Sequence, residues 1–332
     1  VKVFYRKTPN LLLFNYYNLP KLIVRNCTVR RALFYVPGSN ERKLKKATTE
    51  FKVDCIVMDC EDGVAMNQKE NARNNIKNFL DNGPVSTSQP EWSVRINPVV
   101  EKELCEKDID VLLSAKNLPI SICLPKVHHV DHLQWFSEKV WTALVKRPEN
   151  DRGPLKLIIF IESPTAVMNL REICQKALDL STMVPLIPVA LVLGSDDLLA
   201  SLGAMSTPTK EEILYARQKM VLVAKAFGLQ AIDMVNINFK DLKKLKQECE
   251  SGAKMGFTGK QVIHPDQITV TQEAFVPSKY SINWAKNVLE AFKVNQEKGQ
   301  GAFTFEDTMI DMPSVKQAQN IMETAKAAGK IE

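Results

Sequence analysis

The sequence predicts an α/β protein, a TIM (β/α)8 barrel with a C-terminal helical lid module. From residue 31 onward, eight short β-branched runs alternate with polar segments of helical period. The runs are nearly continuous in apolar residues, as parallel strands are when both of their faces are buried. Seven of the eight runs end in charged or polar residues, and the carboxyl ends of barrel strands meet on one face. A doubly wound sheet is the alternative fold.

The eight runs follow one another with no low-complexity linker over residues 31–270. In order they are RALFYVPG, VDCIVMDCEDG, WSVRINP, ISICLPKV, LKLIIFIES, VALVLGSDD, LQAIDMVNI and GFTGKQVIHP. After Pro277 the pattern changes to a helix over about residues 282–298, a glycine-containing stretch and a final helix. We therefore expect a leader over residues 1–29, a barrel over residues 30–276 and a helical lid module over residues 277–332.

The formal net charge of +6 is concentrated at the start of the chain. Residues 1–40 carry seven basic residues and no acidic one, which leaves 37 basic against 38 acidic residues in the rest. The near-neutral body gives no electrostatic case for nucleic-acid binding. No run approaches the roughly 18 apolar residues of a membrane span, so neither nucleic acid nor membrane is expected as a partner.

The first 26 residues are acid-free, basic, and rich in leucine and aromatic residues. This composition predicts a mitochondrial transit segment and a location in the matrix, although its serines are missing. A disordered tail is the main alternative, and a secretory signal fits less well because the apolar run LLLF is short. Seven cysteines form no CxxC pair and are odd in number, which favours free thiols in a reducing compartment.

Two carboxylates stand out by position. Glu162 and Asp197 follow two successive runs, so in a barrel they would face each other across the mouth. Two carboxylates with waters and substrate oxygens are the usual ligands of Mg²⁺. Capping of the next helix or pairing with a lysine is the alternative for each. His128, His129 and His132 have helical spacing, but a solvated helix start is commoner there than a metal site.

Several motifs, in this order, resemble the citrate lyase beta-like group of the HpcH/HpaI aldolase superfamily. They are YVPGSNERKLKKA, MDCEDGVAMNQKENAR, RINPV, LPKV, IES, GSDDLLASLGA, GKQVIHPDQI and GAFTFEDTMIDMPSVKQAQN, and they cover about residues 31–322. One departure lies at residue 196, where the family more often has glutamate and this chain has Asp196.

The resemblance implies a TIM barrel that binds Mg²⁺ and an acyl-CoA thioester. It implies that Glu162 and Asp197 are the metal ligands, that Arg95 contacts substrate near the thioester, and that Asp311 is the catalytic acid/base. The other residues that it assigns to substrate binding are Tyr35, Arg42, Lys46, Ile263 and His264. It also implies a homotrimer in which the C-terminal module closes over a neighbouring barrel.

The activity implied by the resemblance is Mg²⁺-dependent cleavage of citramalyl-CoA to acetyl-CoA and pyruvate, with a reverse condensation. Two alternatives stay open: a lyase or synthase for malyl-CoA or another 3-hydroxyacyl-CoA, and a subunit that needs an acyl-carrier partner. The local sequence also leaves Asp311 open. It stands just before Pro313, where a carboxylate commonly caps a helix that proline starts.

Overall fold

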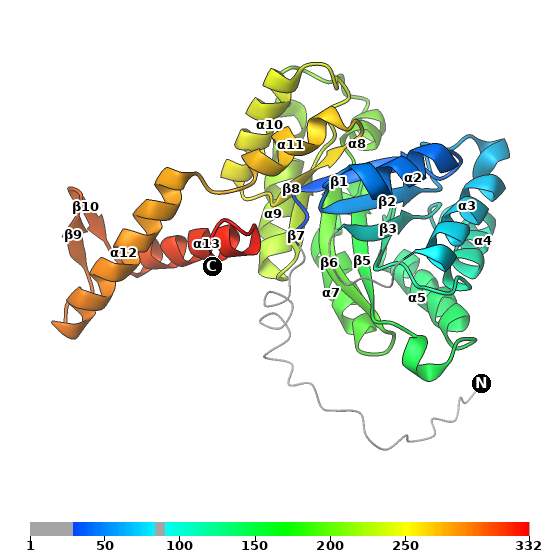
Figure 1. Ribbon diagram of the computed structural model, residues 1–332, viewed down its shortest axis with the longest axis horizontal. Helices are drawn as coiled ribbons and strands as arrows, with labels where there is room; N and C mark the ends of the chain where they lie inside the picture. The colour runs from blue at the N-terminus through cyan, green and yellow to red at the C-terminus, as the bar shows by residue number, and fades with distance from the viewer. Residues whose placement is uncertain (1–28, 84–89, 332) are drawn as a thin grey trace.

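Eight parallel strands close into a barrel in the computed structural model, which describes residues 29–83 and 90–331 (Figure 1). The strands are β1 (Ala32–Pro37), β2 (Cys55–Asp59), β3 (Glu91–Arg95), β4 (Ser121–Leu124), β5 (Leu155–Ile161), β6 (Leu186–Leu193), β7 (Gln230–Asp233) and β8 (Gly259–Val262). Each of the eight predicted runs overlaps one strand, so the barrel prediction is confirmed and the doubly wound alternative is wrong.

The barrel closes because β1 pairs in parallel with both β2 and β8. Leu33 of β1 lies opposite Cys55 on one side and Gln261 on the other. The register between β2 and β3 places Asp59 beside Arg95, at the carboxyl ends of the two strands. This register brings a carboxylate and a guanidinium together at the mouth of the barrel.

Helices cover the outside of the barrel (Figure 1). They are α2 (Glu41–Glu50), α3 (Lys69–Asn82), α4 (Lys102–Leu113), α5 (Val130–Leu144), α6 (Pro164–Met168), α7 (Leu170–Ser181), α8 (Ser195–Leu202), α9 (Leu214–Ala226), α10 (Leu242–Met255) and α11 (Asp266–Ala274). Among the described helices none is long and apolar enough to cross a membrane.

The core has two layers because successive side chains of a strand point to opposite faces. Leu33 faces the barrel interior, where it packs in a cluster with Val57, Phe160 and Ile232. Its neighbour Phe34 belongs to the larger cluster between strands and helices. Burial on both faces explains why the strands read as continuous apolar runs.

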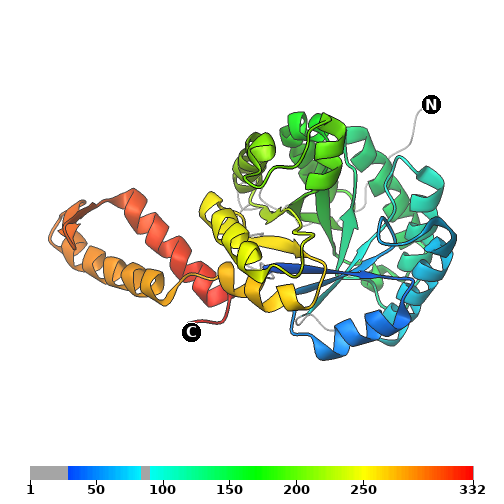
Figure 2. The same cartoon turned by 90° about the horizontal axis from the view of Figure 1, so that it is seen from above.

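The C-terminal module consists of α12 (Lys279–Glu297), the hairpin of β9 (Phe303–Phe305) and β10 (Thr308–Ile310), and α13 (Met312–Ala327). It has a small core of its own around Ala285, Val288 and Val315. Figures 1 and 2 show it projecting from the side of the barrel, away from the rest of the chain. Within one chain the module therefore does not cover the mouth of the barrel.

The six cysteines that the structure describes are free and buried, as expected. Cys27 and the predicted transit segment, up to residue 28, lie outside the described residues.

Candidate active site

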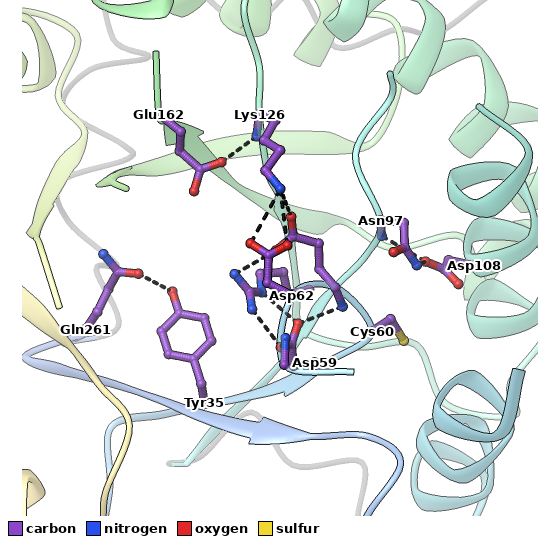
Figure 3. Close-up of polar contacts among 12 residues, drawn as sticks. Tyr35, Asp59, Cys60, Asp62, Asn97, Asp108, Lys126, Glu162 and Gln261 are labelled. Carbon is purple, nitrogen blue, oxygen red and sulfur yellow. Dashed lines mark hydrogen bonds and ion pairs between the residues drawn. The ribbon is translucent and has the colours of Figure 1, made fainter. Parts of the chain in front are cut away.

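Arg95, at the end of β3, is the centre of a polar network at the mouth of the barrel. Figure 3 labels Asp59, Asp62 and Lys126 of this network. The Nε and Nη2 atoms of Arg95 donate to the two carboxylate oxygens of Asp59, at 2.7 and 2.6 Å. Nη1 lies 2.8 Å from Oε2 of Glu61, and the guanidinium lies 5.0 Å from the ring centroid of Tyr35. Burial opposes the charge, but Asp59 and Glu61 raise the pKa of Arg95 above its ordinary value.

Lys126 follows β4 and contacts the same network. Its ammonium lies 2.8 Å from Oε1 of Glu61 and 3.2 Å from Oδ1 of Asp62. Its backbone N–H donates to Oε2 of Glu162 at 2.8 Å. Partial burial opposes the charge of the ammonium, but Glu61 and Asp62 raise the pKa of Lys126. A single residue thus contacts carboxylates from the loop after β2 and from the end of β5.

Glu162 is almost fully buried directly after β5. Burial, together with the negative charges of Glu61 and Asp197, raises its pKa to about 8. Burial also raises the pKa of Asp197, which lies in the first turn of α8. Gly194 allows the close approach, because a Cβ there would lie 2.3 Å from Oε1 of Glu162.

These two carboxylates fit a divalent cation. Each has a raised pKa because burial and neighbouring negative charge disfavour its ionised form, and a bound cation relieves both effects. In the described parts of the chain, no group of three or more histidine, cysteine or acidic residues is arranged to hold a metal. The protein would therefore supply Glu162 and Asp197, and the hard oxygen donors suit Mg²⁺ with retained waters.

The histidine group at His128, His129 and His132 is not such a metal cluster. Nδ1 of His128 instead shares a hydrogen bond of 2.7 Å with the hydroxyl of Ser163. Burial and the neighbouring imidazoles lower the pKa of His128 below its ordinary value. His129 is the N-cap residue of α5, but its side chain makes no cap hydrogen bond.

The residues expected to bind substrate lie at the carboxyl ends of β1 and β8. Tyr35 donates its hydroxyl to Oε1 of Gln261 at 3.0 Å, and burial raises its pKa. Arg42 and Lys46 lie exposed on α2, the helix after β1.

Near the end of β8, His264 stacks on Phe239 with ring centroids 4.5 Å apart, and Ile263 is exposed beside it. These residues rim the same face of the barrel as Arg95.

Asp311 is not brought to this site within one chain. It is the N-cap of α13, and its Oδ1 atom accepts from the backbone N–H of Ser314 at 3.2 Å and from its hydroxyl at 3.1 Å. The helix-cap geometry expected from Pro313 is therefore present. The module that carries Asp311 extends away from the barrel (Figure 2).

Sequence reasoning did not assign the contacts made by Asp59, Gln261 and Lys126. Asp59 and Arg95 are separated by 36 positions in the sequence, and only the register of β2 and β3 pairs them. Glu61 and Asp62, in the loop after β2, form ion pairs with Arg95 and Lys126. Asp196 is exposed and accepts a hydrogen bond from the hydroxyl of Ser195 at 3.3 Å.

Comparison with known proteins gives a consistent result. Residues 31–265 match the HpcH/HpaI aldolase/citrate lyase family. The chain is 47% identical over 296 residues to the mitochondrial citramalyl-CoA lyases of Rattus norvegicus and Homo sapiens. The match to the rat protein covers 89% of this chain and 86% of the relative, and the match to the human protein covers 89% and 85%.

A similar solved structure is CitE from Mycobacterium tuberculosis in complex with magnesium, acetoacetate and coenzyme A. It has a TM-score of 0.71 and 26% identity, and the match covers 91% of this chain and 98% of that one.

Proposed function

Since the chain belongs to the HpcH/HpaI aldolase/citrate lyase family, we propose that it is a carbon–carbon lyase that cleaves citramalyl-CoA to acetyl-CoA and pyruvate. The 47% identity to mitochondrial citramalyl-CoA lyases, over most of both chains, carries this proposal. The mouth of the barrel supports it, because a buried carboxylate pair lies beside a fixed guanidinium.

Glu162 and Asp197 would hold a Mg²⁺ ion, as the magnesium complex of the related CitE suggests. When bound, the ion supplies a Lewis acid that stabilises the alkoxide of the substrate hydroxyl as it becomes the ketone of pyruvate. The contribution of Glu162 is a pre-oriented carboxylate, since the amide of Lys126 already holds one of its oxygens. Asp197 supplies the second negative charge.

Arg95 stabilises the enolate of acetyl-CoA by donating to the thioester oxygen. A guanidinium has five N–H donors. Two of those in Arg95 donate to Asp59, and Nη1 forms an ion pair with Glu61. The N–H groups that do not donate to Asp59 remain for substrate, and the two carboxylates fix the orientation of the guanidinium before the reaction begins. Such fixed donors stabilise developing charge without reorganisation.

The CoA end would be held at the rim. Tyr35 lies beside Arg95, and the exposed cations of Arg42 and Lys46 suit the phosphates of CoA. His264 and the exposed Ile263 line the other side of the mouth.

Asp311 would protonate the enolate carbon, and this role requires a second copy of the chain. The module projects from its own barrel, and Met309 and Met312, which flank Asp311, are 70% and 47% exposed. Exposed apolar side chains around a carboxylate suit a surface that packs on another subunit. A homotrimer in which each module closes over a neighbouring barrel satisfies both observations and excludes water from the enolate.

The mitochondrial location of the two relatives supports the same location here, and we propose the matrix as the compartment. This agrees with the basic, acid-free composition of the first 26 residues.

The test is a cleavage assay on the purified protein with Mg²⁺ and no partner protein. Citramalyl-CoA and malyl-CoA are supplied separately, and acetyl-CoA is measured by chromatography together with pyruvate or glyoxylate. Preferred cleavage of citramalyl-CoA supports the proposal, and preferred cleavage of malyl-CoA replaces the substrate. Activity that appears only with an acyl-carrier protein would instead make the chain a subunit of a larger lyase.

A further inference from the structure

Lys126 lies where the two halves of the site meet, and its side chain has been given no role so far. One half is the Arg95 network, built from the ends of β2 and β3. The other is the carboxylate pair, Glu162 and Asp197, after β5 and β6. Lys126 contacts the first half through its ammonium and the second through its backbone amide (Figure 3).

The backbone of Lys126 is in an unusual conformation. Its φ of 53° lies in the left-handed region, which a residue with a side chain seldom adopts. The neighbours on both sides, Pro125 and Val127, are buried, so the conformation is fixed by packing. The result is that the N–H of Lys126 points at Glu162.

Because of this amide, the two carboxylate oxygens of Glu162 have different roles. Oε2 accepts from Lys126 at 2.8 Å. Oε1 lies against Gly194, at a position that only a residue without a Cβ leaves open. Oε1 is therefore the oxygen left to the cation.

The ammonium performs a second task on Glu61. Oε1 of this carboxylate lies 2.8 Å from Lys126 and Oε2 lies 2.8 Å from Arg95, so Glu61 bridges the two cations. Glu61 is 2% exposed, so its charge depends on these two cations. If the ammonium were removed, Glu61 would turn both oxygens to Arg95 and engage an N–H group that substrate needs.

We propose that Lys126 is a positioning residue that acts on both halves of the site. Its amide orients Glu162 toward the cation, and its ammonium holds Glu61 so that the N–H groups of Arg95 that do not donate to Asp59 stay free for the thioester. The second task rests on the proposed lyase function, whereas the first is tested by cation binding alone.

The experiment uses the full chain and three variants. Lys126→Met removes the ammonium and keeps a long side chain. Lys126→Gly also removes the ammonium, but it tolerates the left-handed backbone and so keeps the amide aimed at Glu162. Lys146→Met is the matched control, because Lys146 forms an exposed ion pair with Asp110 on the outside of the barrel.

Mg²⁺ affinity is measured by calorimetry without substrate, and kcat and KM are measured for the thioester. For Lys126→Gly we expect a Kd for Mg²⁺ within about threefold of wild type and a kcat at least about tenfold lower, with KM changed less than kcat. Lys146→Met should match wild type in all three. If Lys126 had only a structural role, its replacement would lower the melting temperature, and kcat and Mg²⁺ affinity would change together.

A double-mutant cycle tests whether Lys126 acts through Glu61. In a Glu61→Gln background, Lys126→Met should lower kcat by less than about twofold further. Equal losses in both backgrounds would overturn the ammonium role, as would a kcat within twofold of wild type in Lys126→Met itself. A Mg²⁺ affinity lost in Lys126→Gly would overturn the amide role. An inactive wild type with normal Mg²⁺ binding would count against the proposed function and leave the amide role standing.

Discussion

Replacing Glu162 by glutamine should stabilise the metal-free protein at alkaline pH, although it removes a metal ligand. The pKa of Glu162 is raised from 4.5 to about 8 in the folded state, mainly by burial. Between these two values the unfolded chain has lost this proton and the folded chain keeps it. The folded state therefore loses stability as pH rises through this window, by about 1.4 kcal/mol per pH unit and about 5 kcal/mol in all.

Glutamine does not titrate, so Glu162→Gln is free of this penalty at every pH. Any constant difference in hydrogen bonding cancels when the two proteins are compared across pH. Between pH 6 and pH 8 the unfolding free energy of the variant should rise by about 2 kcal/mol relative to wild type, because the folded-state carboxyl is already half ionised at pH 8. With an unfolding entropy of about 2.1 cal/mol/K per residue, this corresponds to a relative shift in melting temperature of about 3 °C.

The assay is thermal unfolding in EDTA at pH 6, 7, 8 and 9, with Glu172→Gln as control, since Glu172 is exposed on α7. Saturating Mg²⁺ at pH 8 should reverse the order, because wild type gains stability from the ion and the variant does not. A difference between variant and wild type that stays constant from pH 6 to pH 9 would refute the raised pKa. A variant stabilised by Mg²⁺ as much as wild type would remove Glu162 from the metal site.

Three further outcomes are expected. Asp197→Ala should lose Mg²⁺ binding and turnover but keep its circular dichroism spectrum, because Asp197 lies at the mouth and outside the packed core. Arg42→Ala and Lys46→Ala should raise KM for the thioester more than they lower kcat, since phosphate contacts are similar in ground and transition states. Asp311→Asn should lower kcat by roughly 10²–10⁴, the usual contribution of a general acid, with KM and melting temperature little changed.

Each expectation has an outcome that contradicts it. Full activity of Asp197→Ala after EDTA treatment and return of Mg²⁺ would show that Asp197 is not needed to bind the ion. An unchanged KM in both α2 variants would place the CoA site elsewhere. A folded Asp311→Asn variant with near-normal kcat would show that Asp311 only caps its helix and is not the proton donor.

The barrel was predictable because the burial of its strands leaves apolar runs that are visible in the sequence. Strands buried on both faces are mostly apolar, so the strands appear in the sequence as short apolar runs, although β8 also carries Lys260 and Gln261. The hairpin of β9 and β10 was not predictable in this way. Its strands have three residues each, and its turn places Glu306 and Asp307 at φ values of 46° and 59° without the usual Asn-Gly signal.

The site was predictable as a set of strand ends but not as a set of contacts. A polar residue after a buried run indicates the mouth, and this found Arg95 and Glu162. Their partners depend on which strand lies beside which and in what register, as the pairing of Asp59 with Arg95 shows. The left-handed backbone of Lys126 has no local signal at all, since no glycine or asparagine stands there.

The two interpretations of Asp311, helix cap and proton donor, are compatible because they use different oxygens. Both hydrogen bonds that form the cap end on Oδ1, one from the amide and one from the hydroxyl of Ser314. The second oxygen, Oδ2, carries the proton chemistry in the proposed reaction. The cap then has a catalytic consequence, since it fixes the direction of Oδ2 on a module that docks on another barrel in the proposed homotrimer. A residue that looks structural in one chain is therefore well placed to be catalytic in the assembly.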